Sequence, residues 1–284
     1  MGSIQTLAIG LGMAGYYALV AVGFGLIFAT LRIFHVAHGT VFVTGGYVFF
    51  FLHRLYGFDL ATSAAIAVAC AAILGVAIDR VIYIPIMRRG GGMFAVFIAS
   101  LGVALIFDAL YLVLTKGVLA IARTDSLQIW NVGAIALRQY DMAMVVLVLV
   151  IFLLLYLWLH RTRTGLEIRA LTDNEMLAGT VGMNVDRTRN SIFLIASAMA
   201  GLAGVLTAYD NGINPDSGNR TLFIAVVAVI LGGVRNLLAG TLLGSVALGI
   251  ITAFAMFLYP EWVTFCIFAM MIVLILFRPK GLFG

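Results

Sequence analysis

The chain has 284 residues, of which 63% are hydrophobic and 10% are charged, and its formal net charge is +5. Soluble globular proteins have about 45–50% apolar and about 25% charged residues, so this composition excludes an ordinary soluble fold. A lipid bilayer is the solvent that fits, and only helices and closed barrels satisfy their backbone in it. Residues 142–159 are apolar without interruption, whereas barrel strands alternate. We therefore predict an all-α, polytopic transmembrane helical bundle.

The apolar runs predict nine spans, with eight or ten as alternatives. In chain order they are 5–30, 39–52, 61–84, 93–115, 141–159, 191–209, 221–234, 239–258 and 262–277. The second and seventh are shorter than the ~20 residues of a full crossing, so half-helices, tilted helices or re-entrant segments are alternatives there. Residues 1–284 are predicted to form a single transmembrane domain, with a cytoplasmic segment at 160–190.

The distribution of basic residues predicts an orientation. With the N-terminus outside, 12 Lys and Arg residues fall on the cytoplasmic side and 5 on the outer side. The positive-inside rule therefore favours an N-out, C-in arrangement. No Lys or Arg precedes Arg32, so the positive region of a cleavable signal peptide is missing and the first span is expected to be retained.

Motifs for catalysis, nucleotide binding or paired-cysteine metal binding do not occur in this sequence. Cys70 and Cys266 stand in apolar runs, where cysteine acts as a small hydrophobe. We expect no enzyme activity, no cofactor and no metal in this chain. Since the basic residues follow the loops between spans, we expect membrane lipid as a partner and no nucleic acid.

The segment 160–190 is the longest polar interruption between spans. It carries five Arg and four acidic residues, yet apolar residues recur in it at helical spacing. Asp173 is placed to cap a short helix over 174–181, and Gly182 to end it. A short amphipathic helix of this kind suits docking into the groove of a partner protein. A solvated connector is the alternative.

Four residues are candidates for a translocation path: His35, His38, Gly39 and Asp108. The two histidines are three residues apart and would share one face of a helix, although bonding to backbone carbonyls at a helix break is an alternative. Asp108 stands within the fourth span, where an ionisable group normally faces the bundle interior or a water-filled cavity. A structural hydrogen bond is its alternative role. Asp79 and Arg80 are expected to be interfacial.

Glycines cluster near the C-terminus at Gly232, Gly233, Gly240 and Gly244. Close helix packing is the ordinary explanation for such spacing. The more specific explanation is that interrupted helices surround a substrate site at the membrane midplane. The polar run 209–220 is either a contact for a periplasmic binding protein or a loop.

Four motifs together resemble the permeases of the branched-chain amino acid ABC importer family, over essentially the whole chain. Ala37-His38-Gly39 with Phe42 resembles the N-terminal signature of that family, and Gly232-Gly233 with Asn236 and Gly244 its glycine-rich segment. The 278–284 tail resembles the family's terminal sequence. The fourth motif resembles its cytoplasmic coupling segment, with Asp173, Asn174, Glu175, Ala178, Gly182, Met183, Asn184 and Val185. His35, Val36 and Arg235 depart from the family pattern, which puts the substrate in doubt more than the architecture.

The resemblance implies a permease subunit of an ATP-driven importer in the bacterial inner membrane. It implies a second homologous permease, two ATPase subunits that bind ATP and Mg²⁺, and a periplasmic binding protein. The coupling residues Asp173, Asn174, Glu175, Ala178, Gly182 and Asn184 would dock on the ATPases and drive alternating access. The expected solute is a branched-chain or other aliphatic amino acid, with urea, short amides or another small solute as alternatives. The competing class is a self-sufficient secondary transporter or channel that uses Asp108, His35 and His38.

Overall fold

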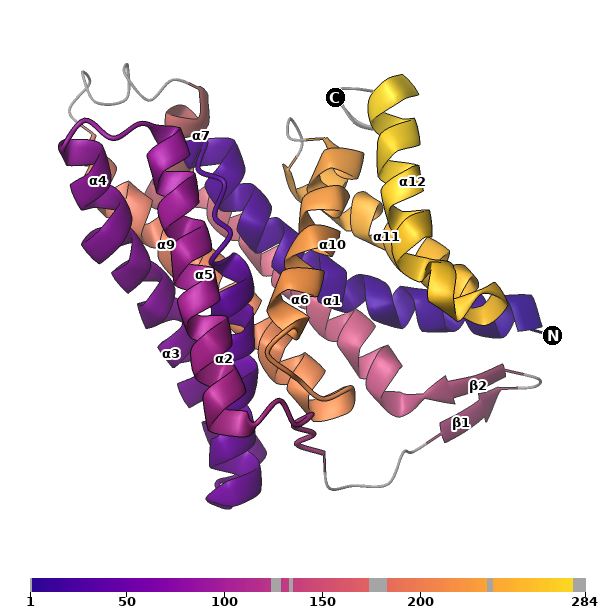
Figure 1. Cartoon of the computed structure of the whole chain (residues 1–284). Helices are drawn as coiled ribbons and strands as arrows, with labels where there is room; N and C mark the ends of the chain where they lie inside the picture. The colour runs from indigo at the N-terminus through magenta and orange to yellow at the C-terminus, as the bar shows by residue number, and fades with distance from the viewer. Residues whose placement is uncertain (1, 124–128, 133–134, 174–182, 234–236, 278–284) are drawn as a thin grey trace. The chain divides into compact units, whose positions relative to one another are not determined.

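The computed structural model describes residues 2–123, 129–132, 135–173, 183–233 and 237–277, and this part of the chain is almost entirely helical (Figure 1). In chain order the elements are α1 (Gly2–Leu31), α2 (His38–Phe50), η1 (Phe51–Leu55), α3 (Leu60–Ile78), η2 (Asp79–Tyr83), α4 (Ile84–Arg88), α5 (Met93–Thr115), β1 (Ile129–Val132), β2 (Ile135–Arg138), α6 (Gln139–Arg161), α7 (Arg163–Asp173), α9 (Val185–Asp210), α10 (Ser217–Gly232), α11 (Leu237–Leu258), η3 (Pro260–Trp262) and α12 (Val263–Phe277). Elements η1 and η2 are π-helical turns, and η3 is a 3₁₀ turn.

Each of the nine predicted spans coincides with a helical segment, which confirms the all-helical class. Six of these segments are long and apolar enough to cross a membrane: Ile4–Leu31, Leu60–Arg88, Met93–Thr115, Gln139–Arg161, Val185–Asp210 and Leu237–Leu258. The helices α2, α10 and α12 are shorter. The two short ranges in the sequence, 39–52 and 221–234, correspond to α2 and α10.

A small antiparallel hairpin, β1 and β2, lies between α5 and α6. Its register pairs Ile129 with Arg138 and Val132 with Ile135. The side-chain amide of Gln5 in α1 bonds to the backbone of Ala136, donating at 2.7 Å and accepting at 2.9 Å. The hairpin occupies part of the polar break 116–140, where no strand was predicted because its strands are only four residues long.

The chain divides into two compact units, and their boundaries fall within α1, between α5 and β1, within α6 and within α10. One unit comprises residues 26–123 and 159–222. In it α9 packs against both α2 and α3. A Cβ added to Gly45 of α2 would lie 2.5 Å from the carbonyl oxygen of Gly201 in α9, so these backbones meet without intervening side chains. Small residues allow such close approach, and α9 is accordingly the central helix of this unit.

The other unit comprises residues 1–25, 124–158 and 223–284. Here the first part of α1 packs closely on α11, because a Cβ on Gly10 would lie 2.8 Å from Cα of Ile250. The helices α10 and α11 also touch through backbone: a Cβ on Gly240 would lie 2.6 Å from the carbonyl oxygen of Gly232. A Cβ on Gly244 would overlap the carbonyl of Ala228.

Two helix ends are formed by residue types that favour such ends, an aspartate and a glycine. Asp59 caps α3 by accepting the backbone N–H of Thr62 at 2.9 Å, and this bond holds the pKa of the carboxyl below its usual value. Gly233 follows the last residue of α10 with a φ of +84°, a conformation in which glycine is favoured. Of the four predicted packing glycines, Gly233 thus ends a helix, while the other three stand where α10 and α11 meet.

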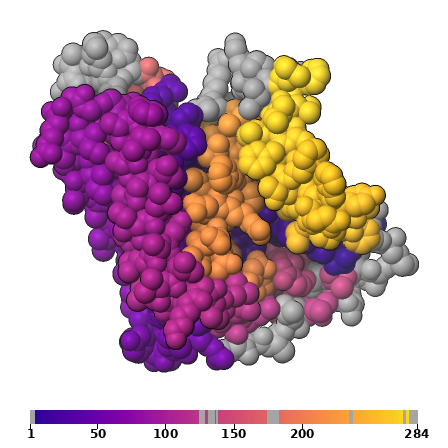
Figure 2. All heavy atoms as spheres, in the orientation of Figure 1, coloured from indigo at the N-terminus to yellow at the C-terminus, as the bar shows by residue number. Residues whose placement is uncertain are grey.

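Helix α5 lies at the surface of the molecule in Figure 2, and many of its exposed side chains are apolar. Leu105 is 61% exposed, Ile106 67% and Val113 77%. So much apolar surface is unfavourable in water but suits contact with lipid or with another membrane subunit.

Candidate functional site

The chain breaks between α1 and α2, and this break carries both candidate histidines. Arg32 adopts a left-handed conformation with φ of 58°, and helix resumes at His38. His35 and His38 are fully buried, and their ring centroids lie 5.6 Å apart. The structure therefore brings the two histidines together, with His35 before the helix and His38 at its first residue.

A hydrogen-bonded cluster surrounds the break. The hydroxyl of Tyr83 in η2 donates to Oγ of Ser100 in α5 at 2.8 Å and lies 2.8 Å from Nδ1 of His35. Because that hydroxyl gives its proton to Ser100, Nδ1 of His35 must carry the proton between them. Its Nε2 is then an acceptor, and it has no hydrogen-bond partner among the described residues. The backbone N–H of Ala37 also donates to Ser100, at 2.9 Å.

The start of α10 connects the other two path candidates. Gly39 of α2 meets Gly218, since a Cβ on Gly39 would lie 2.6 Å from the carbonyl oxygen of Gly218. The next residue, Asn219, donates its side-chain N–H to Oδ2 of Asp108 at 2.8 Å. One turn of α10 thus touches both the beginning of α2 and the middle of α5, so Gly39 and Asp108 belong to one neighbourhood.

Further polar groups follow α2 and α5 away from this point. The hydroxyl of Tyr111 donates to Thr44 at 2.7 Å, and Thr44 donates to the carbonyl of Thr40 at 2.8 Å. The rings of Tyr47 and Tyr111 are stacked, with centroids 4.9 Å apart. These residues place further buried hydroxyl groups along α2 and α5. They were not predicted from the sequence, because tyrosine and threonine are common in membrane helices.

A buried ion pair lies next to the Tyr83 cluster. Nη2 of Arg189 in α9 lies 2.6 Å from Oδ1 of Asp79 in η2, and Nε lies 2.8 Å from Oδ2. Asp79 is fully buried and Arg189 is 6% exposed. Asp79 is thus enclosed by the protein, because its partner, 110 residues away in the sequence, replaces water around the carboxylate. Arg80 is exposed, and its Nε donates to Asn190 at 2.7 Å.

The predicted coupling segment is described only at its two flanks. Asp173 is the last residue of α7, and Asn184 caps α9 by accepting the N–H of Arg187 at 3.0 Å. Thr188 of α9 donates to Glu167 of α7 at 2.8 Å, which joins the two flanks. Asn174, Glu175, Ala178 and Gly182 lie outside the described residues, as do Arg235, Asn236 and the 278–284 tail.

At the opposite end of α9, the polar run 209–220 is tied to the segment after α5. Arg123 pairs with the buried carboxylate of Asp210 at 2.8 Å, and Ala120 forms an antiparallel bridge with Ile213. The run connects two helices, and some of its residues are exposed, so a contact with a periplasmic binding protein stays a prediction.

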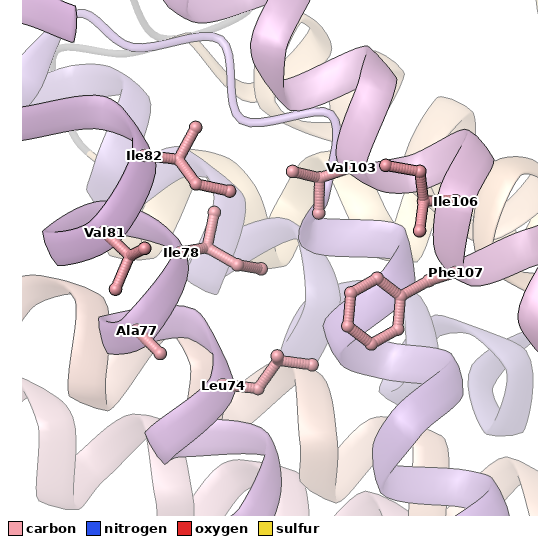
Figure 3. Close-up of a pocket in the computed structure, with 8 residues that line it drawn as sticks. All are labelled: Leu74, Ala77, Ile78, Val81, Ile82, Val103, Ile106 and Phe107. Atoms are coloured by element: carbon pink, nitrogen blue, oxygen red, sulfur yellow. The ribbon is translucent and has the colours of Figure 1, made fainter. Parts of the chain in front are cut away.

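A pocket of about 280 Å³ lies in the same unit but differs in kind (Figure 3). It is lined by Leu74, Ala77, Ile78, Val81, Ile82, Val103, Ile106 and Phe107, from α3, η2 and α5. All eight are apolar, so the pocket offers a polar solute no hydrogen bonds. The polar groups around the starts of α2 and α10 are the better candidate for a solute path.

Among the described residues, no three His, Cys, Asp or Glu side chains gather as metal ligands would. The site instead contains hydrogen-bonding groups: several hydroxyl groups, the imidazoles of the two histidines, the amide of Asn219 and the carboxylate of Asp108. Such groups can replace part of the hydration of a small polar solute during passage.

Comparison with known families decides the class of the protein. A family model described as the permease component of the branched-chain amino acid transport system matches residues 6–276. The chain belongs to this family. It is a transport subunit of the ABC importer type, without a catalytic domain.

Curated relatives are similar to this chain over most of its length. The high-affinity branched-chain amino acid transport system permease protein LivH of Escherichia coli K12 is 28% identical, covering 99% of this chain and 95% of the relative. The ribose import permease protein RbsC of the same strain is 27% identical, covering 82% of this chain and 72% of the relative. A solved structure, PsaBC from Streptococcus pneumoniae in complex with Fab, resembles the fold with a TM-score of 0.52 at 14% identity, covering 99% of this chain and 93% of that one.

Proposed function

We propose that this permease is one of two membrane subunits of a bacterial inner-membrane importer that carries a branched-chain or other aliphatic amino acid. It works with a second homologous permease, two ATPase subunits and a periplasmic binding protein. ATP and Mg²⁺ bind to the ATPases, and this chain needs no cofactor of its own. The chain lies N-out and C-in, as a single permease domain. This orientation puts residues 160–190 on the side where ATP is available.

The observation that carries the proposal is the buried polar neighbourhood at the starts of α2 and α10. His35, His38 and Ser100 are fully buried, and Asp108 is joined to Asn219. Polar groups in a membrane interior are costly and are kept where a solute or water passes. Some transporters place their binding groups near the membrane midplane at the ends of interrupted helices. The meeting of the starts of α2 and α10 resembles that arrangement.

The family description and the name of LivH support an aliphatic amino acid as the solute. A sugar is the second candidate, because the relative RbsC is named a ribose import permease. Selectivity can also rest with the binding protein, which would leave the path with few specific contacts.

The coupling residues Asp173, Asn174, Glu175, Ala178, Gly182 and Asn184 are proposed to dock on the ATPases. Their flanks, α7 and α9, are joined by the Thr188–Glu167 bond, so a force on the segment between them acts on both helices. The permease then alternates between outward-open and inward-open states as the ATPases close and separate.

Co-purification tests this docking. Glu175→Ala should weaken capture of the ATPase subunits by tagged permease about tenfold, since a lost charged contact in an interface costs about 1.4 kcal/mol or more. The control is Glu261→Ala, at an exposed residue of η3 on the predicted outer side. Equal capture by both variants and the unaltered chain would show that 173–184 is not the docking segment.

A further inference from the structure

The first turns of α9 are held by a buried clamp. They follow directly after the predicted coupling segment, and Arg189 within them donates three hydrogen bonds of 2.6–3.0 Å to the two oxygens of Asp79. A bidentate Arg–carboxylate pair fixes both the distance and the relative orientation of the two backbones that carry it. The start of α9 and the π-turn η2 are therefore fastened together.

From the clamp, packed rings lead to the break between α1 and α2. The guanidinium carbon of Arg189 lies 5.9 Å from the ring centroid of Phe193, one turn further along α9. The Phe193 ring in turn meets the rings of His35 and Tyr83, with centroids 5.4 Å and 6.1 Å away. All three rings are fully buried. Close-packed interiors compress little, so a displacement of one ring moves its neighbours.

Hydrogen bonds complete the connection. Asp79 and Tyr83 are the first and last residues of η2, so the turn that holds the clamp also carries the hydroxyl that contacts His35. That hydroxyl donates to Ser100, and Ser100 accepts the N–H of Ala37, the residue before α2. Single π-turns within helices are frequent at functional sites. Here the turn presents Asp79 and Tyr83 to the protein interior, while Val81 between them is 72% exposed.

We propose that Arg189, Asp79, Phe193, Tyr83 and Ser100 form a coupling relay, which makes the start of α9 and the break at residues 32–37 move together. The relay rests on the proposed function, because it needs the ATPases to act on the segment before α9. Its members are positioning residues: they transmit a displacement to His35 and His38 and need not touch the solute. The Arg88–Asp186 pair at 3.6 Å joins α4, which follows η2, to the start of α9, but its exposure limits its contribution.

A cysteine reporter at the break tests the relay without knowledge of the solute. Val36→Cys is placed in a chain whose Cys70 and Cys266 are replaced by Ala, and the full transporter is assembled in proteoliposomes. The probe is a water-soluble thiol reagent, with the ATPases either free or trapped by ATP and vanadate. Trapping should change the labelling rate of the introduced thiol about threefold or more, the size typical of coupling between distant sites. Tyr83→Phe removes only the hydroxyl and should reduce that change to less than about 1.5-fold.

Trapping of ADP and vanadate is measured in the same samples and should stay equal in all variants. Tyr56→Phe, at a tyrosine that is 74% exposed, is the matched control and should keep the full change in labelling. If the change persists in Tyr83→Phe, or if trapping leaves the labelling of the Val36→Cys parent chain unaltered, the relay is wrong. Failure of the ATPases to assemble with the parent chain would instead contradict the proposed function, so the two failures are distinguishable.

Discussion

The Asp79–Arg189 pair is the residue-scale feature with the largest energetic consequence. Taking two charges out of water costs several kcal/mol per ion, and only their mutual bonds offset that cost. Removal of one partner leaves the other charge buried and unpaired, which is far more damaging than removal of an exposed pair.

Arg189→Gln should therefore destabilise the permease by about 3–5 kcal/mol, because the carboxylate of Asp79 loses its counter-ion in a dry environment. The measurement is thermal unfolding in detergent. The double variant Asp79→Leu with Arg189→Met should be milder than the single one, since it leaves no buried charge.

Arg88→Gln is the control for this prediction. It breaks the pair with Asp186, whose side chains are 70% and 56% exposed, and should change stability by about 1 kcal/mol or less. If Arg189→Gln lowers stability no more than Arg88→Gln does, the pair is not buried in the folded permease.

Part of this site could be predicted from the sequence at the residue scale. The spacing of His35 and His38 indicated that they would lie together, and an aspartate within an apolar span indicated that Asp108 would have a polar neighbour. Tyr83, the partner of His35, is 48 residues away from it, and Asn219, the partner of Asp108, is 111 residues away, and no local pattern encodes such pairing. The burial of Asp79 could not be predicted for the same reason, because it depends on Arg189.

At the scale of elements, hydropathy located the helical segments that match the nine predicted spans, but not all of their ends. The sixth predicted span begins at 191, whereas α9 begins at Val185. Charged residues from Asp186 to Arg189 hid those first turns, which Asn184 caps and Arg189 anchors through its ion pair. The π-turns η1 and η2 were not predicted, because nothing in the composition of these two segments distinguished them from α-helix. The hairpin of β1 and β2 was missed because its strands are short.

The contact between α2 and α9 depends on glycine. Gly45→Ala should destabilise the permease by about 1–3 kcal/mol, because the new methyl group would overlap the backbone of Gly201 and force the helices apart. Thermal unfolding in detergent measures this change as well.

Gly102→Ala is the matched comparison within a helix. A Cβ at Gly102 of α5 meets nothing within 4 Å, so this variant should keep its stability or gain up to about 1 kcal/mol from higher helix propensity. Equal stability of the Gly45→Ala and Gly102→Ala variants would contradict the close crossing of α2 and α9.

At the scale of the whole molecule, we propose that the chain lines a solute path and that separate ATPases supply the energy. Its sequence has no nucleotide-binding motif, and the family to which it belongs is a transport component. The apolar faces of α5 and α6 are largely exposed, which suits contact with lipid. Composition was sufficient to predict the bilayer. Partners could be expected only from the family resemblance that the four motifs carry together, because the composition of one chain does not encode another chain.

Solute uptake with and without the ATPase subunits tests the central claim most directly. Proteoliposomes would contain this permease, its second permease and internal ATP, with the binding protein and radiolabelled L-leucine or ribose outside. We predict that one of these solutes accumulates only when the ATPases are present and ATP is hydrolysed. Accumulation driven by a proton or ion gradient, with no ATPase subunit in the membrane, would contradict the importer and favour a self-sufficient carrier.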